Sequence, residues 1–381
     1  MKKIIFLLIT ILSFSCSSTK LSNDYLTSLS NTSKLNFENA TKKNWHNLDL
    51  EKDSVPGMSV ERAYKELVKD FKAKKVIVAV IDAGIDTYHE DLSNLIWVND
   101  KEIPNNLIDD DKNGYIDDIN GWNFLGESYN ETLEMTRIIR DSLNNNRRYD
   151  SAIDNTNSKK GIAKRNFDYY KEITEDYKKS TNDIYNYLGK DEFSKLDLAN
   201  IKSNDSTLLK SIDLLTYFDS IDIDLDYLEE GVEYFSDQIN YHYNTNFNGR
   251  SIVGDNTYDI RDVPYGDSRV QHSKITESHG THVSGIIAGI RNNSIGSNGI
   301  NNNLEIMAIR AVPNGDEYDK DIALGIRYAV DNGARIINMS FGKSYSTNPE
   351  WVIDAIKYAA QNNVLIVHAA GNETEDLDNI T

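Results

Sequence analysis

A histidine stands at the start of a predicted helix in the last third of the chain. His279 precedes small and apolar residues that continue to Gly289, with apolar side chains on every face, which is typical of a helix buried inside a domain. A histidine at the open end of such a helix is held rigidly, and imidazole suits proton transfer near neutral pH. The alternative is a polar first-turn residue that only bonds nearby backbone. His279 is therefore a candidate general base.

Three polar residues stand at or after the ends of predicted strands. Asp82 ends a run of apolar and β-branched residues, Ser340 ends the run 335–340, and Asn372 follows the run 364–370. Carboxyl ends of parallel strands meet at one rim of a sheet, which is where open α/β sheets place their sites. We expect these three residues on the same rim of the sheet. The alternative for Asp82 is an aspartate that caps the following turn.

An acidic loop at residues 108–118 has the spacing of a calcium site. Oxygen-bearing side chains alternate, and Gly114 then permits a sharp turn, as in the first half of an EF-hand loop. Position twelve holds Asn120 where that loop has glutamate, so Asp117 or Asp118 would close the shell. The alternative is an ordinary acidic turn. The expected calcium ligands are Asp109, Asp111, Asn113, the Tyr115 carbonyl and Asp118.

The elements that position these residues alternate along the chain. Strand patterns at 304–312, 335–340 and 364–370 are separated by helix patterns at 318–331 and 349–362. This order predicts an α/β fold in three layers, with a parallel sheet and helices on both faces.

A long segment, about 127–246, interrupts this alternation inside a domain that we place at 59–381. It is charged, rich in Tyr and Asn, and shows helical spacing at 170–188, 206–218 and 227–241. These stripes predict helices that pack on one another, as an inserted hairpin or small bundle.

Composition excludes some classes of function. The 381 residues carry a net charge of −19 with a pI near 4.8, which disfavours nucleic-acid binding.

The N-terminus predicts export. Lys2 and Lys3 precede an apolar stretch, 4–14, that is too short to span a bilayer, so residues 1–16 read as a signal peptide. Cys16 is the only cysteine, and its place after this stretch resembles a lipoprotein processing site. We expect a lipid anchor at Cys16 in the cell envelope or outer membrane, or else secretion with Cys16 discarded. Residues 17–58 would be a tether and N-terminal extension.

Four motifs in chain order, at 80–86, 279–289, 338–342 and 369–372, resemble the subtilisin-like serine peptidases. The resemblance implies an endopeptidase that acts on proteins or peptides. In it Asp82 orients His279, His279 is the general base, and Asn372 donates to the oxyanion. Residues Ser340, Phe341 and Gly342, which we call the substrate edge, would pair with an extended substrate.

The family's serine is not among these motifs. It stands in a Gly-Thr-Ser-Met type sequence, which is absent up to Thr381, and Ser340 lies in the substrate edge instead. We expect the serine beyond Thr381, a sheet incomplete at its C-terminal side, and no activity from residues 1–381 alone.

Two rival interpretations remain. A zinc site at His279 and His282 is disfavoured, because metalloprotease helices space these ligands four apart with a glutamate between them. A surface-exposed binding or scaffold relative, or a non-functional fragment of the peptidase, would account for the missing serine and the long insertion. If the insertion only selects protein partners, its deletion should leave cleavage of small peptides intact.

Overall fold

The computed structural model describes residues 43–68, 72–272, 274 and 277–372. The chain divides into two compact units, 1–70 and 71–381, which are described separately. The predicted signal peptide and the lipidation site at Cys16 lie outside the described residues. Among the described helices, none combines the length and the apolar character needed to cross a membrane.

The described residues of the first unit, 43–68, form three short helical elements. They are the 3-10 helix η2 (Trp45–Asn47), α4 (Leu50–Asp53) and α5 (Val60–Glu66). Asp49 caps α4 by accepting hydrogen bonds from the amides of Glu51 and Lys52. Arg62 on α5 lies 3.2 Å from the Asp49 carboxylate, so this one side chain ties the two helices together.

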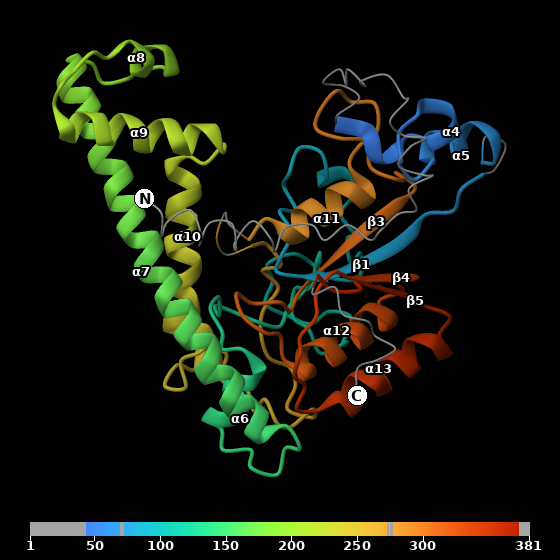
Figure 1. The fold of residues 1–381 in the computed structure, drawn as a ribbon. Helices are drawn as coiled ribbons and strands as arrows, with labels where there is room; N and C mark the ends of the chain where they lie inside the picture. Colours follow the sequence, from blue (N-terminus) through green and yellow to red (C-terminus); the bar gives the residue numbers. More distant parts are fainter. Residues whose placement is uncertain (1–42, 69–71, 273, 275–276, 373–381) are drawn as a thin grey trace. The chain divides into compact units, whose positions relative to one another are not determined.

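The centre of the second unit is a parallel sheet in the order β2-β3-β1-β4-β5. Figure 1 labels β3, β1, β4 and β5 of this sheet. The strands are β1 (Val76–Asp82), β2 (Gly121–Asn123), β3 (Leu304–Arg310), β4 (Ile336–Met339) and β5 (Leu365–His368). The predicted α/β fold is confirmed. We did not predict β2, because three residues that include a glycine and an asparagine carry no strand pattern.

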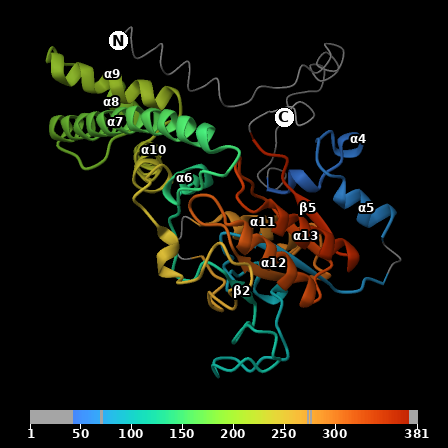
Figure 2. The ribbon, with the colours of Figure 1, turned by 90° about the horizontal axis from the view of Figure 1, so that it is seen from below.

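Helices cover both faces of this sheet (Figures 1 and 2). On one face Val78 and Val80 of β1 share an apolar cluster with Ala288 of α11 (His279–Ala288). On the other face Ala79 and Ile81 share a cluster with α12 (Asp319–Asp331) and α13 (Pro349–Gln361). Because neighbouring side chains of β1 point to opposite faces, its continuous apolar run is buried on both sides.

The strand β5 differs from β1. Among the described residues it lies at one edge of the sheet, and its Leu365 and Val367 side chains are exposed.

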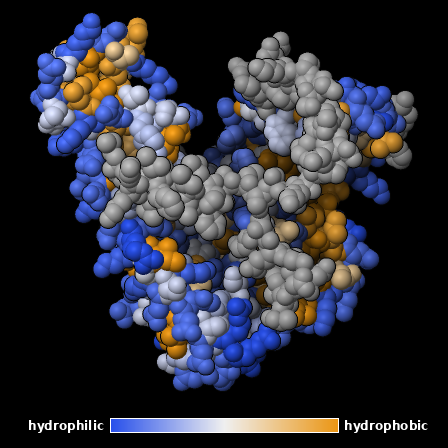
Figure 3. All heavy atoms as spheres, in the orientation of Figure 1, coloured by the Kyte–Doolittle hydropathy of each residue, from blue (hydrophilic) through white to orange (hydrophobic). Residues whose placement is uncertain are grey.

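The segment 127–246 contains several helices. They are α6 (Glu134–Arg140), α7 (Tyr149–Leu188), α8 (Lys195–Asn200), α9 (Ser206–Ser220), α10 (Leu225–Asp237) and the π-helix η4 (Gln238–His242). The 40-residue α7 ends at Gly189, whose positive φ closes the helix, and both α9 and α10 pack along it. The part of the insertion formed by α8 and α9 shows apolar surface, where Leu196 and Leu209 are exposed (Figure 3).

Candidate active site

The end of β1 and the start of α11 bring Asp82 and His279 together. The Nδ1 atom of His279 lies 2.9 Å from both carboxylate oxygens of Asp82. Asp82 is buried with 2% of its side chain exposed, whereas 57% of the His279 side chain is exposed. One side of the imidazole is thus fixed by a buried carboxylate, and the ring still reaches solvent.

Gly280 permits this close approach of the helix to the strand. A Cβ atom at residue 280 would lie 2.3 Å from the Gly84 carbonyl oxygen and 3.1 Å from the Asp82 Cβ. The next residue, Thr281, strengthens the same contact, because its hydroxyl accepts a hydrogen bond from the Asp86 amide at 2.9 Å. Two successive residues therefore position His279: Gly280 lets the helix approach the strand, and Thr281 forms a hydrogen bond to the segment after it.

The surroundings of Asp82 set its charge state and hydrogen bonds. Burial raises the pKa of the Asp82 carboxyl, and the hydrogen bonds from His279 and from the Ala83 amide oppose that rise. An ionised carboxylate only accepts hydrogen bonds, so Nδ1 of His279 carries the shared proton. In the neutral ring Nε2 is then left as a proton acceptor.

A buried arginine that sequence reasoning missed links the residue that follows Asp82 to the segment that precedes His279. Arg310 stands opposite Asp82 in the register of β3 and β1, and its side chain is 1% exposed. It donates to the Ala83 carbonyl at 3.0 Å and to the Glu277 carboxylate at 3.0 Å. Arg310 thus connects the residue after Asp82 with the residue two before His279. The available signal was a charged residue at the end of an apolar strand.

The substrate edge follows β4, the neighbour of β1 in the sheet. The Ser340 hydroxyl accepts a hydrogen bond from Asn338 at 2.9 Å, and the Phe341 ring meets the His368 ring edge-on at 6.2 Å. Gly342 lies beside the same histidine, and Asn372 is exposed after β5. The parallel sheet therefore places Asp82 at the carboxyl end of β1, and the substrate edge and Asn372 after the carboxyl ends of β4 and β5. Their roles in substrate and oxyanion binding stay predictions.

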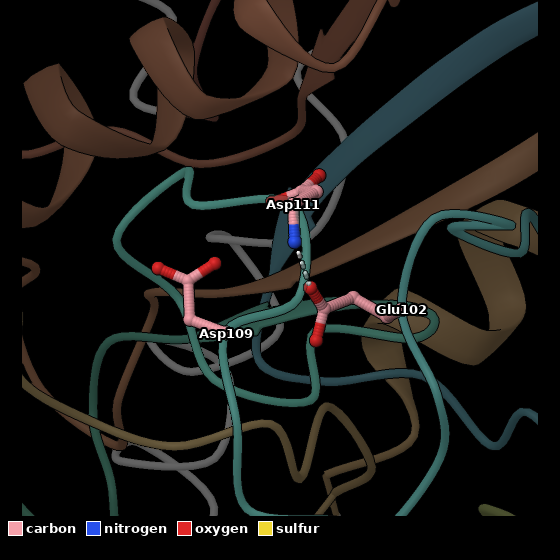
Figure 4. A group of neighbouring side chains, drawn as sticks. All are labelled: Glu102, Asp109 and Asp111. Carbon is pink, nitrogen blue, oxygen red and sulfur yellow. Dashed lines mark hydrogen bonds between the residues drawn. The ribbon is translucent and has the colours of Figure 1, made fainter.

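The acidic loop contains a group of carboxylates that differs from the predicted ligand set. One oxygen each of Glu102, Asp109 and Asp111 lie within 4.8 Å of one another (Figure 4). Glu102 also accepts hydrogen bonds from the amides of Asp111 and Asp117 at 3.0 and 3.1 Å. Sequence reasoning missed Glu102, because it precedes the loop and has no place in the EF-hand spacing.

The other predicted ligands lie around this group in different ways. Asp118 is fully buried, and its carboxylate accepts hydrogen bonds from Asn99, Asn113 and Tyr328 at 2.9, 3.0 and 2.6 Å. The Tyr115 ring packs against the apolar core. Burial raises the pKa of Asp118 to about 6, which the three hydrogen bonds oppose. The structure thus assigns the Asp118 carboxylate oxygens protein partners of their own.

Comparison with known proteins identifies the family. Residues 73–380 match the sequence model of the subtilase family. The chain is 38% identical over 129 residues to a thermophilic serine proteinase of Bacillus sp. (strain AK1). The aligned residues make up 32% of this chain and 28% of that protein. It is also 37% identical over 101 residues to a cell wall-associated protease of Bacillus subtilis (strain 168), and these residues make up 26% of this chain and 11% of that protein.

A third relative is the minor extracellular protease Vpr of Bacillus subtilis (strain 168). It is 31% identical over 147 residues, which covers 38% of this chain and 17% of that protein. The matched parts thus span no more than 28% of the length of these three relatives. The family match extends over most of the described residues, and the chain belongs to the subtilase family.

Proposed function

We propose that this chain is part of a serine endopeptidase and supplies its general base and the carboxylate that orients that base. One observation carries the proposal: the buried Asp82 carboxylate holds Nδ1 of His279 at 2.9 Å while the ring stays open to solvent. Membership of the subtilase family supports a serine-type peptidase in general.

The geometry supports a two-step proton transfer. The free Nε2 of His279 accepts the proton of a serine hydroxyl as that oxygen attacks the substrate carbonyl carbon. The imidazolium ion that forms is stabilised by Asp82. His279 then returns the proton to the departing amine, so the peptide bond breaks without release of a free amide anion.

The remaining rim residues are proposed to bind the substrate. The substrate edge follows β4, which neighbours β1 in the sheet. It would pair with the extended part of a peptide that precedes the scissile bond. Asn372 would donate its side-chain amide to the negative oxygen of the tetrahedral intermediate.

The nucleophile is proposed to be a serine outside residues 1–381. Reading the codons after that for Thr381 tests this part, because a reading frame that closes there in the source genome would contradict it. The functional test is Asp82→Asn in the protein that carries the serine. The amide would face Nδ1 with a donor and favour the wrong tautomer, so kcat for an unstructured protein should fall by about 10⁴. A fall of less than tenfold would contradict the role of Asp82.

Calcium is proposed as a structural ion of the acidic loop. Three carboxylates within 4.8 Å of one another form an oxygen-rich site of the kind that hard cations prefer. Glu102, Asp109 and Asp111 would hold the ion and would no longer repel one another. The bound ion would rigidify the loop that leads into β2.

Export is the proposed destination. The names of two relatives place them at the cell wall and outside the cell, and the N-terminal sequence has the features of a signal peptide. A lipid anchor at Cys16 is the specific form that we propose. Metabolic labelling with a radioactive fatty acid, compared between wild type and Cys16→Ser, would detect it.

A further inference from the structure

The stretch that follows the substrate edge is held by the inserted helices. Lys343, directly after Gly342, lies 3.1 Å from the carboxylate of Glu134 on α6 and 3.0 Å from that of Asp319 on α12. The side chains of Lys343 and Glu134 are 8% and 5% exposed. The ammonium group of Lys343, in the stretch after β4, is thus buried against a carboxylate of the insertion.

A second contact lies two residues further along. The buried Tyr345 hydroxyl accepts a hydrogen bond from Asn155 on α7 at 2.7 Å and lies 3.1 Å from the Ser151 hydroxyl. Arg148, at the start of α7, stacks on the Tyr345 ring at 3.9 Å and donates to the Ser344 carbonyl. The first turns of α7 therefore hold the backbone and the side chains of this stretch.

The insertion also holds the stretch that follows β3. Arg137 on α6 donates to the carbonyls of Asp316 and Glu317 at 2.8 and 2.9 Å. Nearby, Asn314 pairs with Asn130 as an isolated parallel bridge. In the sheet order β3 and β4 lie on either side of β1, which carries Asp82. The stretches that leave the two strands flanking the Asp82–His279 pair thus both rest on one insertion.

Charge makes these contacts difficult to remove. Burial disfavours the ionised form of Glu134, but the charges of Arg137 and Lys343 outweigh it and lower the pKa of Glu134 to about 2. Burial also disfavours the charge of Lys343, and the carboxylates of Glu134 and Asp319 raise its pKa above its usual value. Both groups are therefore charged at neutral pH. Removing one would take a counter-charge from the other, although Glu134 would keep Arg137 and Lys343 would keep Asp319.

We propose that the insertion is a structural part of the peptide-binding cleft, in which Glu134, Lys343 and Tyr345 act as positioning residues that fix the substrate edge. This inference rests on the proposed peptidase function. The alternative is that the insertion only selects protein partners, in which case its deletion would leave cleavage of small peptides intact. Pairing with the backbone of an extended substrate requires fixed backbone groups on the substrate edge. The insertion would therefore contribute to the binding of peptides whatever their sequence.

The first test measures the local stability of the stretch that follows the substrate edge, without catalysis. The amides of Thr347 and Asn348 donate to Asp319 at 3.0 and 2.7 Å, so their hydrogen exchange reports on this stretch. Lys343→Met should speed their exchange at least tenfold, roughly the loss of one charged hydrogen bond. The control is Lys178→Met, which removes an exposed ion pair to Glu229 within the insertion and should leave the exchange unchanged. Equal exchange in both variants would overturn the proposal.

The second test measures peptide binding in the serine-bearing enzyme. Lys343→Met should raise KM for peptides that extend several residues before the scissile bond by about tenfold, with kcat within about twofold. The double variant Glu134→Gln with Lys343→Met removes both charges and should recover part of the loss. If Lys343→Met does not fold, Tyr345→Phe removes only the hydroxyl contacts and should raise KM in the same direction.

The outcomes separate the two proposals. Unchanged KM in Lys343→Met and Tyr345→Phe would refute the role of the insertion while leaving the peptidase function intact. A wild-type protein that hydrolyses no peptide would refute the peptidase function, and the exchange experiment would still decide whether the insertion fixes the edge.

Discussion

Substitution of Gly280 by alanine tests how the helix start places His279. The added Cβ atom would lie 2.3 Å from the Gly84 carbonyl oxygen and 3.1 Å from the Asp82 Cβ. Since a carbon and an oxygen in ordinary contact are more than 3 Å apart, α11 and the end of β1 must separate by about 1 Å. That shift would stretch the 2.9 Å contact between His279 and Asp82 beyond hydrogen-bonding distance.

The expected effect is on catalysis more than on stability. A misplacement of about 1 Å costs about 10²-fold in rate, and full loss of the aspartate contact about 10⁴-fold, so kcat should fall within that range. Overpacking costs about 1–3 kcal/mol, which the better helix propensity of alanine offsets by about 1 kcal/mol. The free energy of unfolding should therefore fall by no more than about 2 kcal/mol.

A second glycine on the same helix gives a matched control. Apart from its chain neighbours and the adjacent backbone of its own helix, no described atom lies within 4 Å of a Cβ built on Gly285. Gly285→Ala should therefore stabilise the protein by about 0.5–1 kcal/mol through helix propensity and leave kcat unchanged. Urea unfolding and peptide hydrolysis measure the two quantities for both variants. If Gly280→Ala behaved like Gly285→Ala in both assays, the close approach of α11 to β1 would not set the geometry of the site.

Two further predictions concern the acidic loop and a buried glutamate. Chelation of calcium should lower the melting temperature of the wild type, and Glu102→Gln should abolish this response. Asp110→Asn changes the same loop outside the carboxylate group and should retain the response. An unchanged melting temperature in the wild type would favour a plain acidic turn. Burial raises the pKa of Glu317 from 4.5 to about 7, so the folded state binds the proton more tightly and the free energy of unfolding should fall by up to about 3 kcal/mol as pH rises from about 5 to 8. Glu317→Gln should remove most of this slope in urea titrations at the two pH values, whereas a wild-type slope in the variant would show that other groups cause it.

The residues of the Asp82–His279 pair could be found from the sequence because each has a local pattern. Asp82 ends a continuous apolar strand, and His279 begins a helix of small residues that must lie close to a neighbour. Both patterns extend over only a few residues, and the parallel sheet then brings them together. The strands and helices after residue 300 were predictable for the same reason.

The partners of these residues could not be found in this way. Arg310 and Glu277 are 33 residues apart, and Lys343 is 209 residues from Glu134. Glu102 enters the carboxylate group because the chain folds back onto the acidic loop. Such pairings depend on the tertiary fold, and a charged residue alone gives no sign of which distant residue it meets.

The most direct test of the central claim compares two histidines of α11 in the serine-bearing protein. His279 contacts Asp82, and His282 is an exposed histidine three residues along the same helix. We predict that His279→Ala lowers kcat for an unstructured protein substrate by about 10⁶ with the fold preserved, whereas His282→Ala stays within about tenfold of the wild type. Wild-type hydrolysis by His279→Ala would contradict the assignment of this histidine as the general base.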